Sequence, residues 1–381
     1  MKTMFKIASL LMAAAMLFSC GEKMGEGSGD DNSGISVANL QLIVDKDVIQ
    51  SNGTDAATFK VLYDGLDVTA DAVIKDSEHK DLGSDTFTAT VDGEYGFYVN
   101  YGTKSTYDNK ADDKGLLTIK AISLPVPEAA DDAFPDKTSF VHRAFLTQYT
   151  GTGCGNCPGM IDIIRVLVND GTVTDKAVHA AVHSYNSGDP AYLAQPSVQA
   201  YPYLSVDMAD WFSVSNGVGT LRHLVEESIS SDAKAGISVN PAYYPESRDL
   251  VVRVSVKAAV DGIYNVGLWL LEDGVYGEQA GAPDETYDIH NNCVRIADSK
   301  YYKTYVGYPL GELKAGQTAE KTFVMYVFKK CVVENLHLAA FVSHGTKKGT
   351  SIIYEVCNAV DAPIDAPTPF EYKGIIAKNG W

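Results

Sequence analysis

The amino-acid sequence predicts a multidomain chain that is mainly β and contains one α/β unit. Three observations support this prediction. Short apolar runs between turn residues fill residues 36–123, a strand–turn–helix–strand order follows within 140–234, and short apolar runs return within 235–372. A proline-rich linker, 124–139, separates the first two regions. We therefore expect two β-sandwiches with an α/β domain between them.

The N-terminus has the features of a lipoprotein signal peptide spanning residues 1–19. Lys2 and Lys6 supply positive charge, and an apolar run follows that is too short to cross a bilayer comfortably. The run ends in Leu17-Phe18-Ser19-Cys20, which matches the lipobox that lipoprotein signal peptidase cuts before cysteine. We expect Cys20 to carry the lipid, which makes the membrane a partner through this anchor.

Composition restricts the partners of the mature chain. The formal charge is −18 at pH 7, and removal of Lys2 and Lys6 with the signal peptide makes it −18 − 2 = −20. This balance argues against nucleic acid and against electrostatic binding to anionic headgroups. Residues 20–35 are rich in Gly, Ser and acid and predict a flexible tether. We expect a cell-envelope protein anchored in the outer membrane, facing the periplasm or the exterior.

Residues 36–123 show strand-type alternation and no catalytic group. Leu40, Leu42 and Val44 alternate with other residues, as on a half-buried strand. The segment Asp92-Gly93-Glu94-Tyr95-Gly96-Phe97 resembles the tyrosine corner of immunoglobulin-like sandwiches, in which a tyrosine hydroxyl binds an upstream backbone group. The region is similar to bacterial immunoglobulin-like modules, which implies a spacer or adhesion unit.

The next region predicts a βαβ unit. A strand is expected over 142–149, a glycine-rich turn over 151–159, a helix over 160–168 with Gly171 as its stop, and a strand over 177–184. Beyond residue 235, apolar runs predict the strands of a second sandwich. Residues 373–381 are expected to form a tail.

The turn contains Cys154-Gly155-Asn156-Cys157. At this spacing two cysteines straddle the first turn of a helix, and the unpaired amides there favour thiolate over thiol. Cys154 could attack a disulfide, and Cys157 could resolve the mixed disulfide. Pro202 lies 202 − 154 = 48 residues beyond Cys154. Thioredoxin-like folds place a cis-proline beside the cysteine pair at a comparable separation, where its backbone receives the substrate; a trans-proline in an ordinary loop is the alternative.

The segment from Tyr149 to Pro158 resembles the cysteine motif of the twenty-eight-kilodalton outer membrane protein family of Bacteroidota lipoproteins. The strand with His183 and the segment His290–Arg295 also resemble family patterns. This resemblance spans roughly 140–372 and implies a thioredoxin-like domain followed by a β-rich region. Gln148 stands where an acid is expected, and Gly153 stands where a tryptophan typically precedes the thioredoxin pair.

Three interpretations of the cysteine pair remain open at this stage. They are active dithiol chemistry, an inert disulfide in an oxidising envelope, and a metal site that adds His183 or His179 to the two thiolates. We expect no bound metal and no cofactor. The three other cysteines of the mature chain, Cys293, Cys331 and Cys357, cannot all pair among themselves, so at least one is a buried thiol or reaches another molecule.

These observations predict a lipid-anchored surface protein with a thioredoxin-like domain. Its activity would be thiol–disulfide exchange or peptide binding on envelope or extracellular proteins, with catalytic residues Cys154, Cys157 and Pro202. The alternative is a non-enzymatic interaction or adhesion protein in which the cysteine pair is a structural disulfide.

Overall fold

The computed structural model describes residues 34–37, 40–64, 66–111, 113–299, 305–348 and 351–375. The signal peptide and Cys20 lie outside these residues, and the first strand begins at Gly34, two residues before the expected start of the sandwich at residue 36. The described part is mainly β with two α-helices, as the sequence predicts. It holds no helix with the length and apolar character needed to span a membrane.

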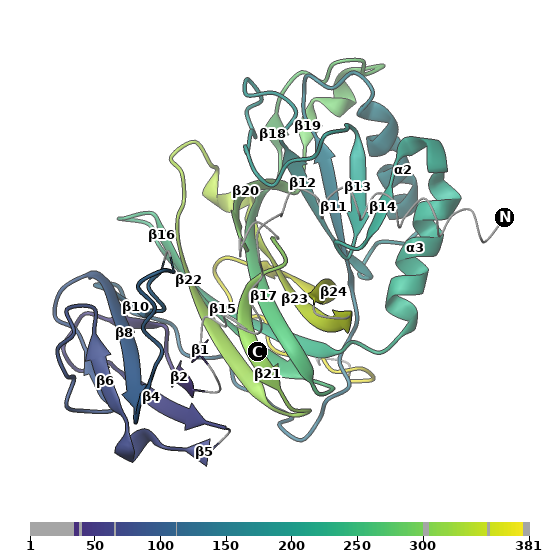
Figure 1. Ribbon diagram of the computed structural model, residues 1–381. Helices are drawn as coiled ribbons and strands as arrows, with labels where there is room; N and C mark the ends of the chain where they lie inside the picture. The colour runs from purple at the N-terminus through teal and green to yellow at the C-terminus, as the bar shows by residue number, and fades with distance from the viewer. Residues whose placement is uncertain are drawn as a thin grey trace.

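The N-terminal region is a sandwich of two sheets (Figure 1). In spatial order the first sheet contains β1 (Gly34–Val37), β2 (Leu40–Val44), β4 (Ala56–Tyr63) and β5 (Leu66–Asp67), with β7 (Thr86–Thr88) paired to β4. The facing sheet contains β3 (Val48–Gln50), β10 (Leu117–Ile122), β8 (Gly93–Tyr101) and β6 (Val73–Asp76), with β9 (Lys104–Ser105) paired to β8. A 3-10 turn, η1, spans Thr69–Asp71.

One apolar core joins these two sheets. Alternating residues of β2 and β4 face alternating residues of β8 and β10, and the rings of Phe59 and Phe97 meet at a centroid distance of 5.0 Å. The expected tyrosine hydrogen bond is present, since the Tyr95 hydroxyl donates to the Val91 carbonyl at 2.9 Å. This bond ties the start of β8 to the preceding turn.

The central region forms the predicted βαβ unit. Strand β11 (Ala144–Thr150), helix α2 (Pro158–Asn169) and strand β12 (Ala177–His183) follow in order, and the two strands pair in parallel. Gly171 has a φ of +76°, which suits glycine and ends the helix at the expected place. Strands β13 (Tyr203–Val206) and β14 (Asp210–Phe212), 3-10 turn η2 (Val214–Asn216) and helix α3 (Val218–Ser230) complete this unit.

The sheet of the βαβ unit continues without a break into the C-terminal region. Its spatial order is β14, β13, β11, β12, β20 (Cys293–Asp298), β17 (Gly262–Glu272), β23 (Leu336–Lys348) and β24 (Ser351–Pro363), with β21 (Tyr308–Leu313) paired to β17. Strand β20 joins the halves through a parallel bridge between Ala181 and Cys293 and an antiparallel pairing to β17. This continuity unites the two regions that the sequence divides at residue 234.

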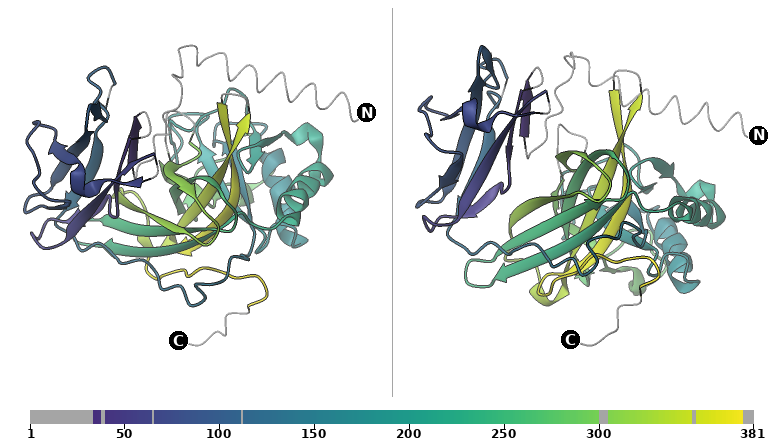
Figure 2. Two further views of the ribbon diagram at one scale, coloured as in Figure 1. Left: turned by 60° about the horizontal axis from the view of Figure 1, so that its bottom comes forward. Right: turned by 90° about the horizontal axis from the view of Figure 1, so that it is seen from below.

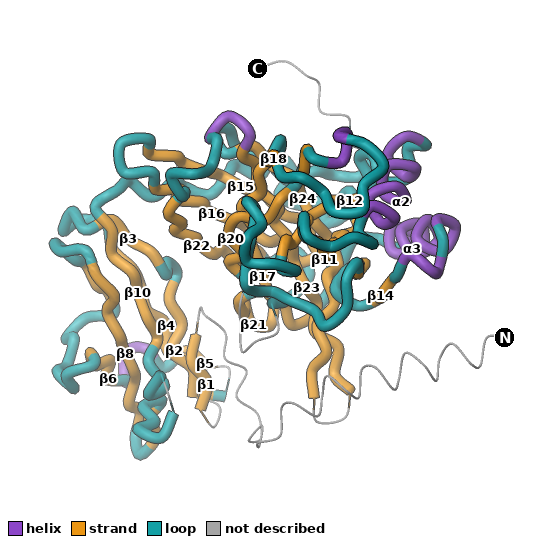
Figure 3. The backbone as a smooth tube through the Cα atoms, turned by 90° about the horizontal axis from the view of Figure 1, so that it is seen from above, coloured by secondary structure: helices purple, strands orange, loops and turns teal. Residues whose placement is uncertain are grey.

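Two layers cover this sheet. Helices α2 and α3 pack together on one face of β11 and β13, and Figure 3 shows them on one side of the strands. A three-stranded sheet of β15 (Ala235–Tyr244), β16 (Asp249–Ala258) and β22 (Thr318–Tyr326) packs on β17 and β23. The short elements β18 (Val275–Tyr276), η3 (Glu285–Tyr287), β19 (Ile289–His290) and η4 (Val333–Asn335) lie in the connections.

The N-terminal sandwich stands beside the three-stranded sheet (Figure 2). Val48 and Ile122 share a small apolar cluster with Val251 of β16. Asp47 forms an ion pair with Lys321 of β22 and accepts the Thr322 N–H at 3.3 Å. The N-terminal sandwich is therefore held to the three-stranded sheet by these side-chain contacts as well as by the linker 124–139.

A buried carboxyl joins three elements around β11. Asp207 accepts the Phe145 N–H at 2.8 Å and the hydroxyl of Ser228 on α3 at 2.5 Å, and its carbonyl accepts the Val356 N–H of β24 at 2.9 Å. Burial raises the pKa of Asp207 to about 6, because these donors only partly replace the lost hydration of the carboxylate.

Asp207 should make stability decrease as pH rises. Because its folded pKa lies above the unfolded value, its contribution is fully present below about pH 4 and is lost as pH rises through 6, a change of roughly 3 kcal/mol. Asp207→Asn retains an acceptor for Phe145 and should remove this component. Urea titrations of both proteins from pH 4 to 7 test it, and identical pH profiles would contradict it.

Candidate functional site

The two cysteines of the motif form a disulfide at the start of α2. Their Cα atoms lie 5.4 Å apart, and Cys157 is the N-cap residue of the helix. The Cys154 N–H donates to Gly151 O at 3.0 Å, and the Cys157 N–H donates to Cys154 O at 3.1 Å, so the loop is a tight pair of turns. The sequence prediction that the pair lies at a strand-to-helix turn is confirmed.

Both cysteines are buried, which the sequence did not predict. Cys154 is 3% exposed and Cys157 is 0% exposed, whereas Gly155 and Asn156 between them are exposed. The N-terminal thiol of a working thioredoxin pair must be reachable by a substrate. In this structure the sulfur expected to be the nucleophile is closed off.

A segment between β17 and β20 covers the cysteine loop. We name residues 274–291 the cover segment; it contains β18, η3 and β19 (Figure 1). The Ala280 N–H donates to Thr152 O at 2.7 Å, and the side-chain amide of Gln279 donates to Cys154 O at 3.0 Å. A Cβ on Gly281 would lie 2.2 Å from Gly155 O, so the two backbones are in direct contact.

The cover segment is also anchored on α2. Arg165 donates to Thr286 O at 2.7 Å, and its guanidinium lies 4.1 Å from the centroid of the Tyr287 ring. The Tyr287 hydroxyl donates to Asp162. Because these contacts come from the first two turns of the helix, the segment covers both the loop and the helix start.

The Tyr201–Pro202 peptide bond is cis, the isomer that the thioredoxin resemblance implies. In the β11–β13 pairing, Tyr149 lies opposite Tyr203. Continuing this register places Pro202 level with Thr150, at the strand end from which the cysteine loop begins. A contact between Pro202 and the cysteines is not among the described interactions.

The two positions that depart from the family pattern have structural partners. Gln148 is 4% exposed, and the distance between its Oε1 and His179 Nε2 is 3.0 Å. Gly153 donates its N–H to Asn186 Oδ1 at 3.0 Å, and a Cβ there would lie 2.9 Å from the same oxygen. A tryptophan at position 153 would require Asn186 to move.

The two histidines that the sequence offered as metal ligands have other partners. His183 Nδ1 lies 2.9 Å from Asp189 Oδ2, and His183 Nε2 lies 3.6 Å from Cys293 Sγ. Burial lowers the pKa of His179 to about 4, so this residue is neutral near pH 7. Over the described ranges, no group of three or more His, Cys, Asp or Glu side chains is arranged to hold a metal ion.

The remaining described cysteines are free and buried, which confirms the expectation of at least one buried thiol. Burial raises the pKa of Cys357 to about 12, so it is a neutral thiol. Cys331 Sγ accepts from Arg295 Nε at 3.4 Å, and Arg295 also pairs with Glu272 at 3.1 Å. Burial and Glu272 outweigh Arg295, so the pKa of Cys331 is raised.

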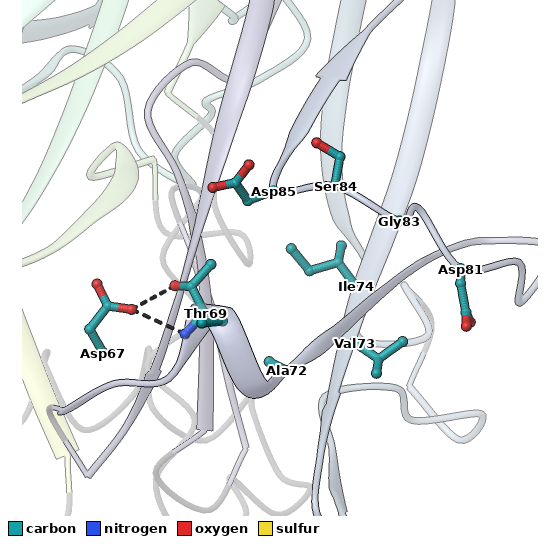
Figure 4. A pocket seen from close by; sticks show the side chains of 10 residues that line it. Asp67, Thr69, Ala72, Val73, Ile74, Asp81, Gly83, Ser84 and Asp85 are labelled. Carbon is teal, nitrogen blue, oxygen red and sulfur yellow. Dashed lines mark hydrogen bonds between the residues drawn. The ribbon is translucent and has the colours of Figure 1, made fainter.

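A hollow in the N-terminal sandwich offers a weaker candidate site (Figure 4). Two of its carboxylates are already engaged, since Asp67 accepts from the N–H and hydroxyl of Thr69 and Asp81 pairs with Lys75. The figure shows these side chains spread around the rim rather than converging on one point. We therefore place the candidate site at the cysteine loop.

Sequence reasoning missed two residues that shape this site, Gln279 and Asp189. Asp189 Oδ2 accepts the Thr152 N–H at 2.6 Å as well as the His183 N–H, so it joins the loop to β12. Burial acts to raise the pKa of Asp189, but His183 and the backbone donors hold it at about 2. The tripeptide Gly188-Asp189-Pro190 is typical of a turn, and nothing in it indicates a contact with the cysteines.

Comparison with known proteins gives one distant similarity. No protein-family profile matches the chain, and no curated protein matches it. A solved structure that matches is HBP35 of Porphyromonas gingivalis, with 15% sequence identity and a TM-score of 0.48. The match covers 64% of this chain and 81% of that one.

Proposed function

We propose that this protein is a lipid-anchored protein of the cell envelope that binds partner proteins, and that its Cys154–Cys157 pair is a structural disulfide. The burial of both cysteines beneath the cover segment carries this proposal. It favours the non-enzymatic alternative that the sequence left open over redox turnover.

Thiol–disulfide exchange requires an external thiolate to reach a sulfur atom. At 3% and 0% exposure, neither cysteine offers such a path while the cover segment stays in place. Opening the segment would break the hydrogen bonds of Gln279 and Ala280 to the loop and separate Arg165 from Tyr287. Exchange is therefore disfavoured by the cost of breaking several contacts at once.

The cover segment itself offers a surface for a partner. Tyr276 and Ile289 lie opposite each other in the β18–β19 pairing and are 62% and 49% exposed. Two large exposed apolar side chains on neighbouring strands are suited to contact another protein. In this proposal the disulfide stiffens the loop against which the cover segment rests.

The other assignments in this proposal rest on the sequence. They are the lipid on Cys20, an immunoglobulin-like spacer over 36–123, a thioredoxin-like unit over 140–234 and membership of the twenty-eight-kilodalton outer membrane protein family. The parallel β11–β12 pair and the disulfide at the helix start support the thioredoxin-like assignment. The Tyr95 hydrogen bond supports the immunoglobulin-like one.

Removal of the disulfide should reduce stability. For the double substitution Cys154→Ala/Cys157→Ala we expect a loss of about 2 kcal/mol, because closing a loop this short removes only a small chain entropy from the unfolded state. Urea unfolding followed by tryptophan fluorescence measures it. An unchanged unfolding free energy would contradict the structural role.

Access to the sulfurs can be tested with a matched pair of variants. Gln279→Ala removes the amide that binds the loop, whereas Glu278→Ala changes an exposed neighbour in the same segment. Under limiting dithiothreitol, we expect the first variant to be reduced several-fold faster than the unmodified protein and the second at an unchanged rate. Equal rates for all three proteins would show that the cover segment does not protect the pair.

Exchange chemistry is the second candidate function, and the position of the cysteine pair at the start of α2, after a strand of a parallel β11–β12 pair, is the observation that favours it. It predicts a pair that reduces near thioredoxin-like potentials, at roughly −270 mV, and a Cys154 that is alkylated rapidly in the folded protein. Trapping with Cys157→Ser in cells would then yield mixed disulfides on Cys154. The structural-disulfide proposal predicts none.

A further inference from the structure

A buried thiol at the start of β20 lies at the end of a chain of proton donors and acceptors. Cys293 is 0% exposed, and its Sγ lies 3.6 Å from His183 Nε2. The opposite ring nitrogen, His183 Nδ1, lies 2.9 Å from Asp189 Oδ2. The three side chains come from β20, β12 and the loop after β12, so only the folded chain brings them together.

The hydrogen bonds around Asp189 determine which nitrogen of His183 can accept a proton. Asp189 also accepts the N–H groups of Thr152 at 2.6 Å and Ala191 at 2.8 Å, and an ionised carboxylate can only accept. His183 Nδ1 therefore carries the hydrogen, which leaves the Nε2 lone pair facing Cys293. Burial raises the pKa of the Cys293 thiol, so it needs a base to lose its proton, and a thiol beside an oriented imidazole is the arrangement that activates cysteine nucleophiles.

The surroundings restrict what this thiol could meet. His290 lies against His183 with ring centroids 5.0 Å apart, and its Nε2 hydrogen-bonds Gly277 O at 2.9 Å. The base of the cover segment thus closes over the pair, and His183 is only 1% exposed. A peptide or a bulky disulfide cannot reach Sγ past these groups, so any co-reactant of this thiol has to be a small molecule.

We propose that Cys293 is an oxidant-reactive thiol, with His183 as its base, and that its co-reactant is a small hydroperoxide. The Cys293 proton passes to His183 Nε2, and the sulfur attacks one peroxide oxygen. The O–O bond breaks and an S–O bond forms, which leaves a sulfenic acid. The departing oxygen takes the proton from His183 and leaves as water or an alcohol, so sulfur is oxidised by two electrons and the peroxide is reduced.

Asp189 acts as a positioning residue in this step. Its carboxylate holds the ring of His183 and stabilises the imidazolium that forms when the proton arrives. Because the same oxygen binds the Thr152 N–H, the thiol site and the disulfide loop share one anchor. The proposal does not depend on whether the disulfide is structural.

Cys357 provides a comparison within the same chain. It is a free thiol that is also buried, at 8% exposure. Among the described contacts no imidazole hydrogen-bonds Cys357. If burial alone governed oxidation, Cys293 would react no faster than Cys357.

The test is a timed exposure of the full chain to hydrogen peroxide, with sulfenic acid trapped by dimedone and each cysteine quantified by peptide mass spectrometry. We expect Cys293 to be oxidised at least tenfold faster than Cys357. His183→Gln should lower the Cys293 rate at least tenfold and leave Cys357 unchanged. His179→Gln, a control on the same strand, should alter neither rate.

Two results would overturn the proposal. One is equal oxidation of Cys293 and Cys357 in the unaltered protein, a comparison that holds even if a histidine variant fails to fold. The other is a Cys293 rate that His183→Gln leaves unchanged while circular dichroism shows the native fold.

Discussion

Replacement of Lys257 by methionine is expected to lower the free energy of unfolding by about 3 kcal/mol. Lys257 is 1% exposed, and its Nζ binds Asp132 Oδ2 at 2.8 Å, Pro135 O at 2.5 Å and Tyr372 OH at 3.3 Å. Methionine retains the apolar stem but removes the donor to the Pro135 carbonyl and the positive charge beside the partly buried Asp132 carboxylate, which keeps only the neutral donors Tyr372 OH and Phe134 N–H. Losing one partner of a buried ion pair is strongly destabilising.

The size of this effect follows from where Lys257 lies. Its ammonium group, on β16, holds the linker on one side and the C-terminal segment around Tyr372 on the other. The measurement is urea unfolding followed by tryptophan fluorescence, which reports on the region beyond residue 139 because no tryptophan lies before it.

Lys314→Met is the matched control for Lys257→Met. Lys314 is 63% exposed and pairs with Asp261 at 3.2 Å, so its loss should change stability by no more than about 0.5 kcal/mol. Equal effects of the two substitutions would mean that the Lys257 cluster contributes no more than a surface pair.

Trp269→Ala should destabilise both halves of the large sheet together, by about 4 kcal/mol. Trp269 lies on β17 at 0% exposure, and its Nε1 donates to Ser299 Oγ at 2.7 Å. Its ring meets Phe145 of β11 and Phe341 of β23 at centroid distances of 5.3 and 5.7 Å. Truncation to alanine leaves a large cavity between the βαβ unit and the C-terminal strands.

The experiment uses Trp211 as a reporter on the other half of the sheet. In a Trp381→Phe background, Trp211 on β14 is the one tryptophan that remains after Trp269→Ala. We expect its urea midpoint to fall together with the midpoint of the far-UV circular dichroism signal. A Trp211 transition that stays in place would show that the two halves unfold independently. Trp269→Phe retains most ring contacts and should cost only about 1–2 kcal/mol.

Most local elements could be predicted because their signals are local. The strand at 142–149, the helix at 160–168 and the strand at 177–184 appear within two residues of β11, α2 and β12. Apolar spacing, Pro158 and Gly171 determine these elements through contacts a few residues long. The place of the cysteine pair at a helix start and the tyrosine hydrogen bond follow in the same way, because the residues involved lie three and four positions apart.

The state of the cysteine pair could not be predicted in this manner. The cover segment reaches Cys154 from 125 residues away through Gln279, and Cys293 meets His183 across 110 residues. Such contacts depend on how β20 joins β12 through the bridge between Ala181 and Cys293. No periodicity or motif in the chain encodes that pairing.

The sequence by itself therefore determined the mainly β character, the βαβ unit and the place of the cysteine pair at a helix start, and it predicts the export signal. The tertiary structure alone decided that one sheet contains strands from both sides of residue 234 and that the sulfurs of the Cys154–Cys157 pair are buried. It also decided that the Cys293 thiol, the His183 imidazole and the Asp189 carboxylate come together. The physical reason is the distance along the chain over which each kind of interaction acts. Propensities and turns act between neighbours along the chain, whereas burial and the orientation of a base depend on segments that only the complete fold brings together.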